Sequence, residues 1–339
     1  MNSVRLSYLS YQLPDQLVCD AVLAERLSCD EESVAALSLG RGRYHAPDGE
    51  GPADLAARAA RTMFDHAGLG PEDIDFILFA TNSADLYFPG SACILQEMLG
   101  CGTVACLDLR SGCTGFVTAL DVARRFVTTG AFERVLVVAG EASSHQNRFD
   151  GRDIELACLM GDGAAVAVVE LADGGLELLS CSLGNDGSRH AAYWCEFPAS
   201  RYLDESGGVR RGRISLEKIE TGAHYPRVDF DELARIAAEH LPRVLDDALA
   251  QAGLDRVDTA ILAHLDPRVA AAVGESLTPV ARRVLFPPVL YTASATLPIG
   301  LGMARESGEV LAGDTVALLT AGSGASWGCA VVRVGGADG

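Results

Sequence analysis

Cys113 lies where an apolar, strand-like run ends and an apolar helical run begins. The pattern predicts a strand over Thr103–Leu109 and a sharp turn over Arg110–Gly112. A helix is expected over Thr114–Thr129, ending at Gly130. A thiol at the first turn of a helix faces unpaired backbone N–H groups and the positive end of the helix dipole, which lower its pKa. The thiolate attacks thioester and ester carbonyls, and the same N–H groups stabilise the oxyanion that forms.

The other interpretation of Cys113 is a buried thiol without chemical function. The chain has ten cysteines, and most buried free cysteines behave as small hydrophobic residues. The ten lie scattered without metal-ligand spacing, and Cys101 and Cys106 do not form a CxxC pair. The sequence therefore predicts no metal site, and it favours a reduced, cytoplasmic location.

Four further stretches accompany the Cys113 segment, Asp108–Leu120, in a fixed order. They are Ala80–Leu99, Val135–Ser143 with Gly161–Glu170, Ala260–Pro267 and Gly322–Arg333. Together these segments resemble the β-ketoacyl-acyl-carrier-protein synthase III family of the thiolase-fold superfamily. The resemblance implies an α/β architecture, the thiolase-like duplicated αβαβα five-layer fold. It also implies that an acyl group moves from a coenzyme A or carrier-protein thioester onto Cys113.

In that family a Cys-His-Asn set decarboxylates malonyl-carrier protein, and the carbanion attacks the acyl-enzyme. The resemblance places the nucleophile at Cys113 and the histidine at His264, but the asparagine position falls on Tyr291, in the segment Leu290–Ser294. No asparagine follows Asn185, so no small shift of register restores the amide. Decarboxylation needs two donors aimed at the thioester oxygen, and the loss of one such donor costs about 10²–10³ in rate.

The missing amide favours an acyltransferase that passes the acyl group to a hydroxyl, amine or thiol acceptor on a small molecule or carrier protein. His264 is then a general base that deprotonates the acceptor. One alternative is a decarboxylating synthase that condenses a starter unit, with Tyr291 or a water in place of the amide. Another is a non-catalytic partner subunit, although intact Cys113 and His264 argue against it. The expected role lies in secondary metabolism of the polyketide type, without a cofactor.

A third member of the catalytic set has two candidates, Asp266 and Tyr291. Asp266 lies two residues after His264, so in an extended segment both side chains share a face and the carboxylate can orient the imidazole. The interpretation that the sequence favours is an N-cap for the helix that begins at Pro267. Tyr291 is a candidate because its hydroxyl can donate a hydrogen bond where the amide is missing.

Two more residues take their roles from the resemblance. The backbone N–H of Gly324 joins that of Cys113 in an oxyanion hole, and the same Gly-Ser-Gly segment also suits a tight turn between strands. Phe88 reaches across a homodimer interface to close the acyl tunnel of the partner, the alternative being an ordinary core aromatic residue.

Composition limits the partners. A net charge of −19 argues against nucleic acid, which requires clustered basic residues. The densest basic cluster, Arg210, Arg211 and Arg213, either docks an acidic carrier protein or is a solvated loop. In the family, a tryptophan stacks on the adenine of coenzyme A. The equivalent position here falls near Ser33 and Val34, and the absence of an aromatic residue there favours a carrier-protein donor.

No uncharged apolar stretch is long enough to span a membrane, and the N-terminus lacks the features of a signal peptide.

The chain divides into two similar halves, residues 1–172 with the nucleophile and residues 173–339 with the histidine. Strand–helix–strand order recurs in both. Residues 184–222 are irregular and are expected to surround the substrate entrance as loops. The clearest expected elements are the helices Asp54–Ala67, with Asp54 as its cap, and Phe230–Ala252, kinked or broken at Pro242, and the strands Ile74–Ala80 and Asp258–His264.

Overall fold

The computed structural model describes residues 3–196, 202–203, 209–210 and 215–335. Its main strands fall into two sets of five. The first set comprises β1 (Ser3–Gln12), β2 (Phe76–Ala80), β3 (Ala105–Leu109), β4 (Arg134–Ala142) and β5 (Asp162–Ala172). The second set comprises β6 (Leu176–Asn185), β11 (Val257–Ala263), β12 (Ala281–Leu285), β13 (Thr315–Gly322) and β14 (Ser326–Val334).

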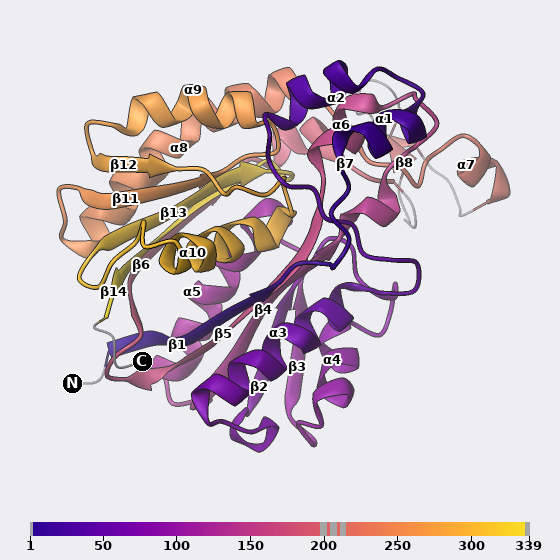
Figure 1. The fold of residues 1–339 in the computed structure, drawn as a ribbon. Helices are drawn as coiled ribbons and strands as arrows, with labels where there is room; N and C mark the ends of the chain where they lie inside the picture. Colours follow the sequence, from indigo (N-terminus) through magenta and orange to yellow (C-terminus); the bar gives the residue numbers. More distant parts are fainter. Residues whose placement is uncertain (1–2, 197–201, 204–208, 211–214, 336–339) are drawn as a thin grey trace.

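All ten strands form one sheet, in the order β12-β11-β13-β14-β6-β1-β5-β4-β2-β3 (Figure 1). Each set has the same internal order, with its third strand at the outer edge and its first strand at the centre. The two sets meet where β1 pairs with β6, through Arg5 with Glu177 and Leu6 with Leu176. One topology is therefore used twice. The predicted boundary after residue 172 falls in the connection between β5 and β6, and the division into two domains stays a prediction.

Helices complete the layers around the strands. They are α3 (Pro52–Ala67), α4 (Ser91–Leu99), α5 (Gly115–Thr128), α8 (Phe230–Ala252), α9 (Pro267–Leu277) and α10 (Thr296–Glu306). Helix α3 packs on β1, β4 and β5, and α8 packs on β6, β13 and β14, whereas α5 and α10 each contact strands of both sets. The two helices α5 and α10 therefore form the middle layer (Figure 1). The predicted α/β, thiolase-like, five-layer architecture is confirmed.

Local chemistry explains the ends of the outer helices. In α3, the N–H of Gly51 donates to the carboxylate of Asp54 at 2.9 Å, so Gly51 occupies the cap position and Asp54 bonds back to it from the first turn. The expectation that Asp54 itself is the cap is corrected. Helix α8 has the predicted bounds and is continuous across Pro242, so it is not broken there.

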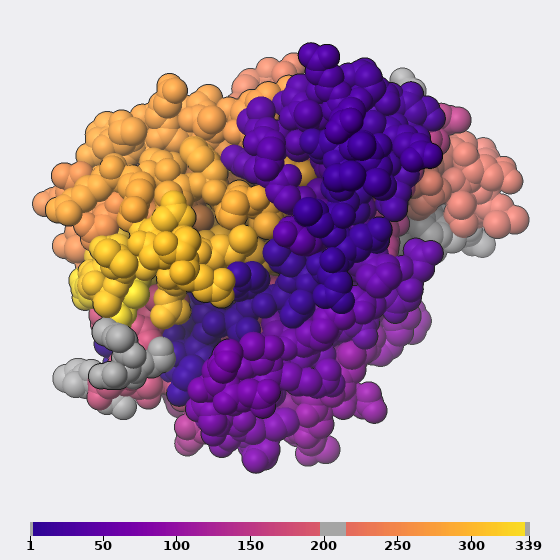
Figure 2. All heavy atoms as spheres, viewed as in Figure 1, coloured from indigo at the N-terminus to yellow at the C-terminus, as the bar shows by residue number. Residues whose placement is uncertain are grey.

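The N-terminal segment after β1 packs on the first half of the chain. It carries α1 (Asp20–Leu27) and α2 (Glu31–Ser38), and α2 packs on α6 (Ile154–Leu159). In Figure 2 the indigo N-terminal residues lie beside the orange second half and above the purple remainder of the first half. The short elements are β7 (Tyr193–Trp194), β8 (Tyr202–Leu203), β9 (Val209–Arg210), α7 (Leu216–Glu220) and β10 (Arg227–Val228). None of the described helices is long and apolar enough to cross a bilayer.

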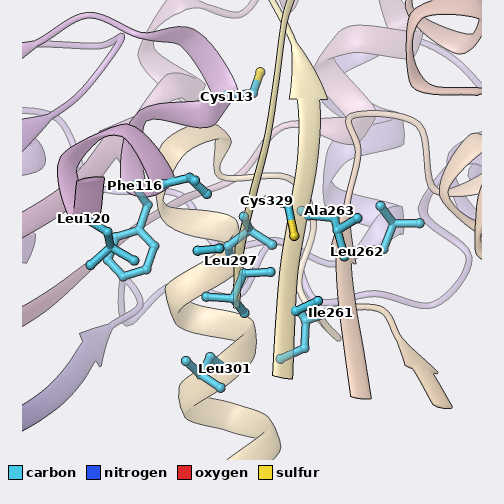
Figure 3. Close-up of a cluster of buried hydrophobic side chains, with 14 of the residues drawn as sticks. Cys113, Phe116, Leu120, Ile261, Leu262, Ala263, Leu297, Leu301 and Cys329 are labelled. Carbon is cyan, nitrogen blue, oxygen red and sulfur yellow. The ribbon is translucent and has the colours of Figure 1, made fainter. Parts of the chain in front are cut away.

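The apolar core that supports the site lies where α5 and α10 meet the second set of strands. Phe116 and Leu120 of α5 lie near Leu297 and Leu301 of α10, together with Cys329 of β14 (Figure 3). In this view the side chain of Cys113 sits at the end of the cluster and points away from it. Close packing of this apolar cluster thus holds the start of α5 in place, while the Cys113 thiol points away from the cluster.

Candidate active site

The turn that carries the nucleophile joins β3 to α5 through a short 3₁₀ segment, η2 (Gly112–Thr114). Gly112 has a φ of 59°, in the left-handed region that favours glycine. A Cβ at this position would also lie 2.8 Å from the carbonyl oxygen of Ser323. The amide of Asn82 donates to the carbonyl of Gly112 at 3.3 Å and holds the turn from outside. Cys113 is therefore fixed at the start of a helix, as the sequence predicts.

Cys113 lines a cavity of about 650 Å³, within the range of about 300–1,000 Å³ usual for small-molecule sites. The deep wall contains buried side chains, among them Ser143, Asn147, Met160 and Ala293. The mouth contains exposed ones, namely Leu86, Tyr87, Arg110, Asn185, His190 and Cys195. Several of these come from residues 184–222, the segment expected around the entrance.

The thiol of Cys113 does not have the lowered pKa that its helix position predicts. Burial raises the pKa, hydrogen bonding by Tyr291 and Ser323 opposes the rise, and the charge of Glu141 adds to it. The side chain is 3% exposed and packs on Gly322, where a Cβ would lie 2.7 Å from that of Cys113. Loss of water around the thiolate therefore outweighs the helix terminus. The resting thiol is protonated at neutral pH.

Tyr291 occupies the expected asparagine position and reaches the nucleophile. Its hydroxyl interacts with the thiol of Cys113 and lies 3.4 Å from Oγ1 of Thr320. Its backbone is fixed on both sides, since its N–H donates to Leu159 at 3.1 Å and its carbonyl accepts from Gly161 at 2.9 Å. Burial raises the pKa of Tyr291 well above its usual value. The hydroxyl thus keeps its proton and can donate a hydrogen bond to a thiolate.

His264 follows β11 and is 3% exposed. Its Nδ1 lies 3.0 Å from the backbone N–H of Asp266 and 3.2 Å from the carbonyl oxygen of the same residue. That carbonyl already accepts from the N–H of Ala270 at 3.1 Å. The arrangement therefore favours Nδ1 as acceptor, with the proton on Nε2. Burial lowers the pKa of His264, so the ring is neutral at pH 7.

The other side of the His264 ring is less engaged. Within the described residues Nε2 makes no hydrogen bond, although the backbone at Leu233 in α8 lies close enough to favour a proton on the ring. His264 does not line the cavity, and the described part of the chain shows no hydrogen bond between its ring and Cys113. Of the two residues proposed to act with the thiol, Tyr291 interacts with it, whereas His264 shows no interaction with it in the described part of the chain. Neither residue is part of the cavity lining.

Asp266 acts as the helix cap. Its carboxylate accepts from the backbone N–H of Arg268 at 2.8 Å and pairs with the guanidinium of that residue at 2.7 Å. Pro267 begins α9, as predicted. The carboxylate therefore engages Arg268, and it is the backbone N–H of Asp266 that positions the imidazole.

Gly324 lines the cavity, whereas Phe88 does not. Gly324 lines the same cavity as Cys113 and has a φ of 132°, which suits only glycine. Phe88 is 79% exposed and continues an exposed apolar stretch with Leu86 and Tyr87. The interpretation of Phe88 as a core residue of its own chain is therefore wrong.

Glu141 is a buried carboxylate beside the site that the sequence analysis missed. The hydroxyls of Ser83 and Ser294 each lie 2.6 Å from it, and the Asn82 amide donates to it at 3.0 Å. Burial raises the pKa of Glu141 against these hydrogen bonds. Because Asn82 also holds Gly112, this carboxylate is linked to the nucleophile turn. The only signal in the sequence was a charged residue inside the apolar run of β4.

Two other expectations concern metal ions and basic residues. Among the described residues no cluster of His, Cys, Asp and Glu has the arrangement of a metal site. Arg211, Arg213 and the side chain of Arg210 lie outside the part of the chain that the structure describes.

Comparison with known proteins identifies the relatives of this chain. Residues 107–187 match the family model of 3-oxoacyl-[acyl-carrier-protein] synthase III, and residues 285–334 match its C-terminal model. The β-ketoacyl-[acyl-carrier-protein] synthase III of Methylococcus capsulatus is 31% identical over 328 residues, which cover 95% of this chain and 96% of that protein. The enzyme of the same name from Cereibacter sphaeroides is 32% identical over 336 residues, 96% of this chain and 97% of the relative.

A solved structure agrees with the sequence relatives. The β-ketoacyl-[acyl-carrier-protein] synthase III of Thermus thermophilus superposes with a TM-score of 0.82 at 26% identity, over 97% of this chain and 99% of that one. The first matched region contains Cys113, and the second contains Tyr291 and Gly324.

Proposed function

Because the chain belongs to the 3-oxoacyl-[acyl-carrier-protein] synthase III family, we propose that it takes an acyl group from a carrier-protein or coenzyme A thioester onto Cys113 and passes it to a hydroxyl, amine or thiol acceptor. The observation that carries this proposal is the contact between Tyr291 and the thiol. Where the family mechanism requires an amide aimed at the malonyl thioester, this chain has a phenol directed at the nucleophile itself.

The chemistry divides into two transfers. In the first, the Cys113 sulfur loses its proton and attacks the thioester carbonyl, and the carbon–sulfur bond of the donor breaks as the donor thiol leaves with a proton. The N–H groups of Cys113 and Gly324 stabilise the tetrahedral oxyanion. In the second transfer the acceptor attacks the acyl-enzyme carbonyl and returns the thiol to Cys113. Tyr291 stabilises the thiolate whenever it is formed or released.

The tautomer of His264 separates this proposal from its main alternative. A general base needs a free Nε2 and hence a proton on Nδ1, which the 3.2 Å contact with the Asp266 carbonyl allows. A donor to a thioester oxygen needs the proton on Nε2, which the 3.0 Å contact with the Asp266 N–H favours. The second arrangement supports the alternative function, a decarboxylating synthase in which His264 and Tyr291 supply two donors. A non-catalytic subunit has no need of these features.

The deciding experiment follows the acyl-enzyme. Incubation with acyl thioesters should add the acyl mass in intact-protein mass spectrometry, and Cys113→Ala should abolish the addition. Cys195→Ala, which removes the other thiol at the cavity, should still be labelled. Acyl-enzyme is then mixed with labelled malonyl-carrier protein, and released carbon dioxide is compared with transfer to hydroxyl, amine and thiol acceptors. Decarboxylation as fast as transfer would establish the alternative function.

The same proposal includes a homodimer. Leu86, Tyr87 and Phe88 are exposed apolar residues, and β3, at the edge of the sheet, exposes Leu107. An apolar edge of this kind usually pairs with another chain. Light scattering should give about twice the chain mass of 35.6 kDa. An active monomer would exclude Phe88 as a residue that crosses between subunits. A cytoplasmic location and a role in polyketide-type metabolism complete the proposal.

A further inference from the structure

One wall of the Cys113 cavity is polar and lacks hydrogen-bond partners. It comes from η3 (Ser143–Gln146) and the residue after it. The side chains of Ser143, Gln146 and Asn147 line the cavity, and within the described residues none of the three has a hydrogen-bond partner. Ser143 is 5% exposed and Asn147 is 7% exposed, and among the described residues the Nδ2 of Asn147 is wholly buried without a partner. We call these three residues the polar wall.

Other amides at the same cavity are already satisfied. Asn82 donates to Glu141 and Gly112, and Asn185 donates to the carbonyl of Ala325 at 3.4 Å. Buried polar side chains in folded proteins nearly always have a partner, and exceptions mark places where a water or ligand completes the set. Oδ2 of Asp85 and Nε1 of Trp194, elsewhere on the cavity, also lack a partner among the described residues. What distinguishes the polar wall is that three neutral polar side chains without partners lie together there.

The charges around the cavity restrict what the polar wall can bind. The wall contains no cationic side chain, its deep neighbours Met160 and Ala293 are apolar, and Arg110 and His190 are exposed at the mouth. The buried charged group that acts on the nucleophile is Glu141, an acid. A carboxylate bound at the wall would have no buried cation to pair with and would lose its water, which is costly. Hydroxyl and keto groups can use the hydroxyl and amides of the wall without that cost.

We propose that the acyl group carried by Cys113 bears an uncharged oxygen substituent, a hydroxyl or a keto group, which Ser143, Gln146 and Asn147 bind. This inference rests on the proposed role of Cys113 as acyl carrier. The cavity of about 650 Å³ also has to hold the thioester arm, so the acyl chain is short. The polar wall determines specificity, and it selects the substituted acyl group over a plain alkyl chain.

The test compares pantetheine thioesters of four acids that differ in one group: butyric, 3-hydroxybutyric, 3-oxobutyric and succinic acid. The rate of acylation of Cys113 is followed by intact-protein mass spectrometry. The hydroxy and oxo thioesters should load about 10- to 100-fold faster than butyryl and succinyl, since one unpaired buried polar group accounts for a difference of that size. Equal or faster loading of the butyryl or succinyl thioester would overturn the inference.

Two variants and one control test whether the polar wall causes the preference for hydroxy and oxo acyl groups. Asn147→Leu should reduce the ratio of hydroxybutyryl to butyryl loading about 10-fold, and Ser143→Ala should reduce it in the same direction. Asn185→Leu, at the mouth with an amide that is already bonded, should keep the ratio. Circular dichroism checks that each variant is folded. A ratio that both Asn147→Leu and Ser143→Ala leave unchanged would place the specificity elsewhere.

Binding to Cys113→Ala separates this inference from the proposed function. Calorimetry with the same thioesters measures selection without chemistry, and the dissociation constants should follow the same order. If the wild-type enzyme is not acylated but Cys113→Ala still prefers the hydroxy and oxo thioesters, the acyl-transfer function fails while the polar wall stands. If all four thioesters bind equally, or if the preference appears only when the acceptor is varied, the inference fails and acyl transfer stands.

Discussion

Two turns at the centre of the molecule have the same backbone design and different chemistry. After β3 the chain forms η2 and runs directly into α5, and after β12 it forms η5 (Ala293–Ala295) and runs directly into α10. The first residue of each turn is left-handed, with a φ of 59° at Gly112 and 40° at Ala293. The second residue is Cys113 in one turn and Ser294 in the other. The duplicated fold has therefore produced two positions at the start of a central helix.

The surroundings of Cys113 and Ser294 determine which of the two side chains can act as a nucleophile. Cys113 lines the cavity, and the hydroxyl of Tyr291, which is not part of the lining, interacts with its thiol. Ser294 is 1% exposed, and its hydroxyl lies 2.6 Å from Glu141 and 3.1 Å from the carbonyl of Ala80. A helix N-terminus supplies N–H groups in both turns, but only one turn has space for a substrate. The comparison teaches that the turn alone does not make a nucleophile.

The most severe test moves the thiol from one turn to the other. The double variant Cys113→Ser/Ser294→Cys should lose acylation by about 10³-fold or more, a loss on the scale expected when a catalytic nucleophile is removed. The new thiol would lie against Glu141 and Ala80, away from the cavity. Mass spectrometry after incubation with acyl thioester measures the loss, and the single variant Ser294→Cys is the matched control. Acylation of the relocated thiol in the double variant would show that the turn is sufficient.

The left-handed residue of the nucleophile turn should be nearly irreplaceable. Gly112→Ala introduces a Cβ against Ser323 at a φ of 59°. Backbone strain of this kind costs about 1–3 kcal/mol, and the displaced turn should reduce acylation strongly. Urea denaturation and acylation rates measure the two effects. A stable and fully active Gly112→Ala enzyme would contradict the role assigned to this turn.

Tyr291→Phe should make the thiol a weaker acid. The phenol lowers the pKa of Cys113 against the effect of burial, so its removal should raise the pKa further. One hydrogen bond corresponds to about one pKa unit, and alkylation by iodoacetamide at pH 8 should slow about 10-fold. In the wild-type enzyme the rate should still be rising at pH 9.0, the usual pKa of a thiol, because the native pKa lies above it. A plateau near neutral pH would contradict the burial argument.

The raised pKa of Cys113 also determines how its thiol contributes to protein stability as the pH changes. A thiol whose pKa is higher in the native state binds its proton more tightly there, so its contribution to stability is complete below the unfolded pKa of 9.0 and is lost as the pH rises through the native value.

The smallest effect belongs to the second turn. Ala293→Gly removes a left-handed alanine, which should stabilise the protein by about 0.5–1 kcal/mol after the greater freedom of the unfolded chain is counted. Acylation should change little, because Ser294 takes no part in it and the substitution removes only one methyl group from the cavity wall. Thermal denaturation measures the gain, and destabilisation by Ala293→Gly would show that the alanine methyl packs usefully.

The sequence was informative where chemistry is local. The strand and helix around Cys113, the bounds of α8 and the Asp266 cap each follow from residue patterns over a few positions, and each is confirmed. The pKa of the thiol was predicted wrongly because burial depends on contacts with Tyr291 and Gly322, which are distant in the chain. The absence of His264 from the cavity lining and the polar wall of Ser143, Gln146 and Asn147 likewise depend on tertiary packing. Glu141 gave a local signal, a charge within an apolar strand, but its partners come from two distant segments, Thr81–Ser83 and Ser294.

The protonated state of Cys113 also affects how long the protein survives in an oxidising environment. Peroxide attacks thiolates, and it converts them first to sulfenic acid and then to irreversible sulfinic and sulfonic acids. A nucleophile that keeps its proton in the resting state exposes little thiolate to that attack. The same burial that slows the first acyl transfer therefore protects Cys113 from oxidation between turnovers. A faster nucleophile at this position would also be oxidised more readily.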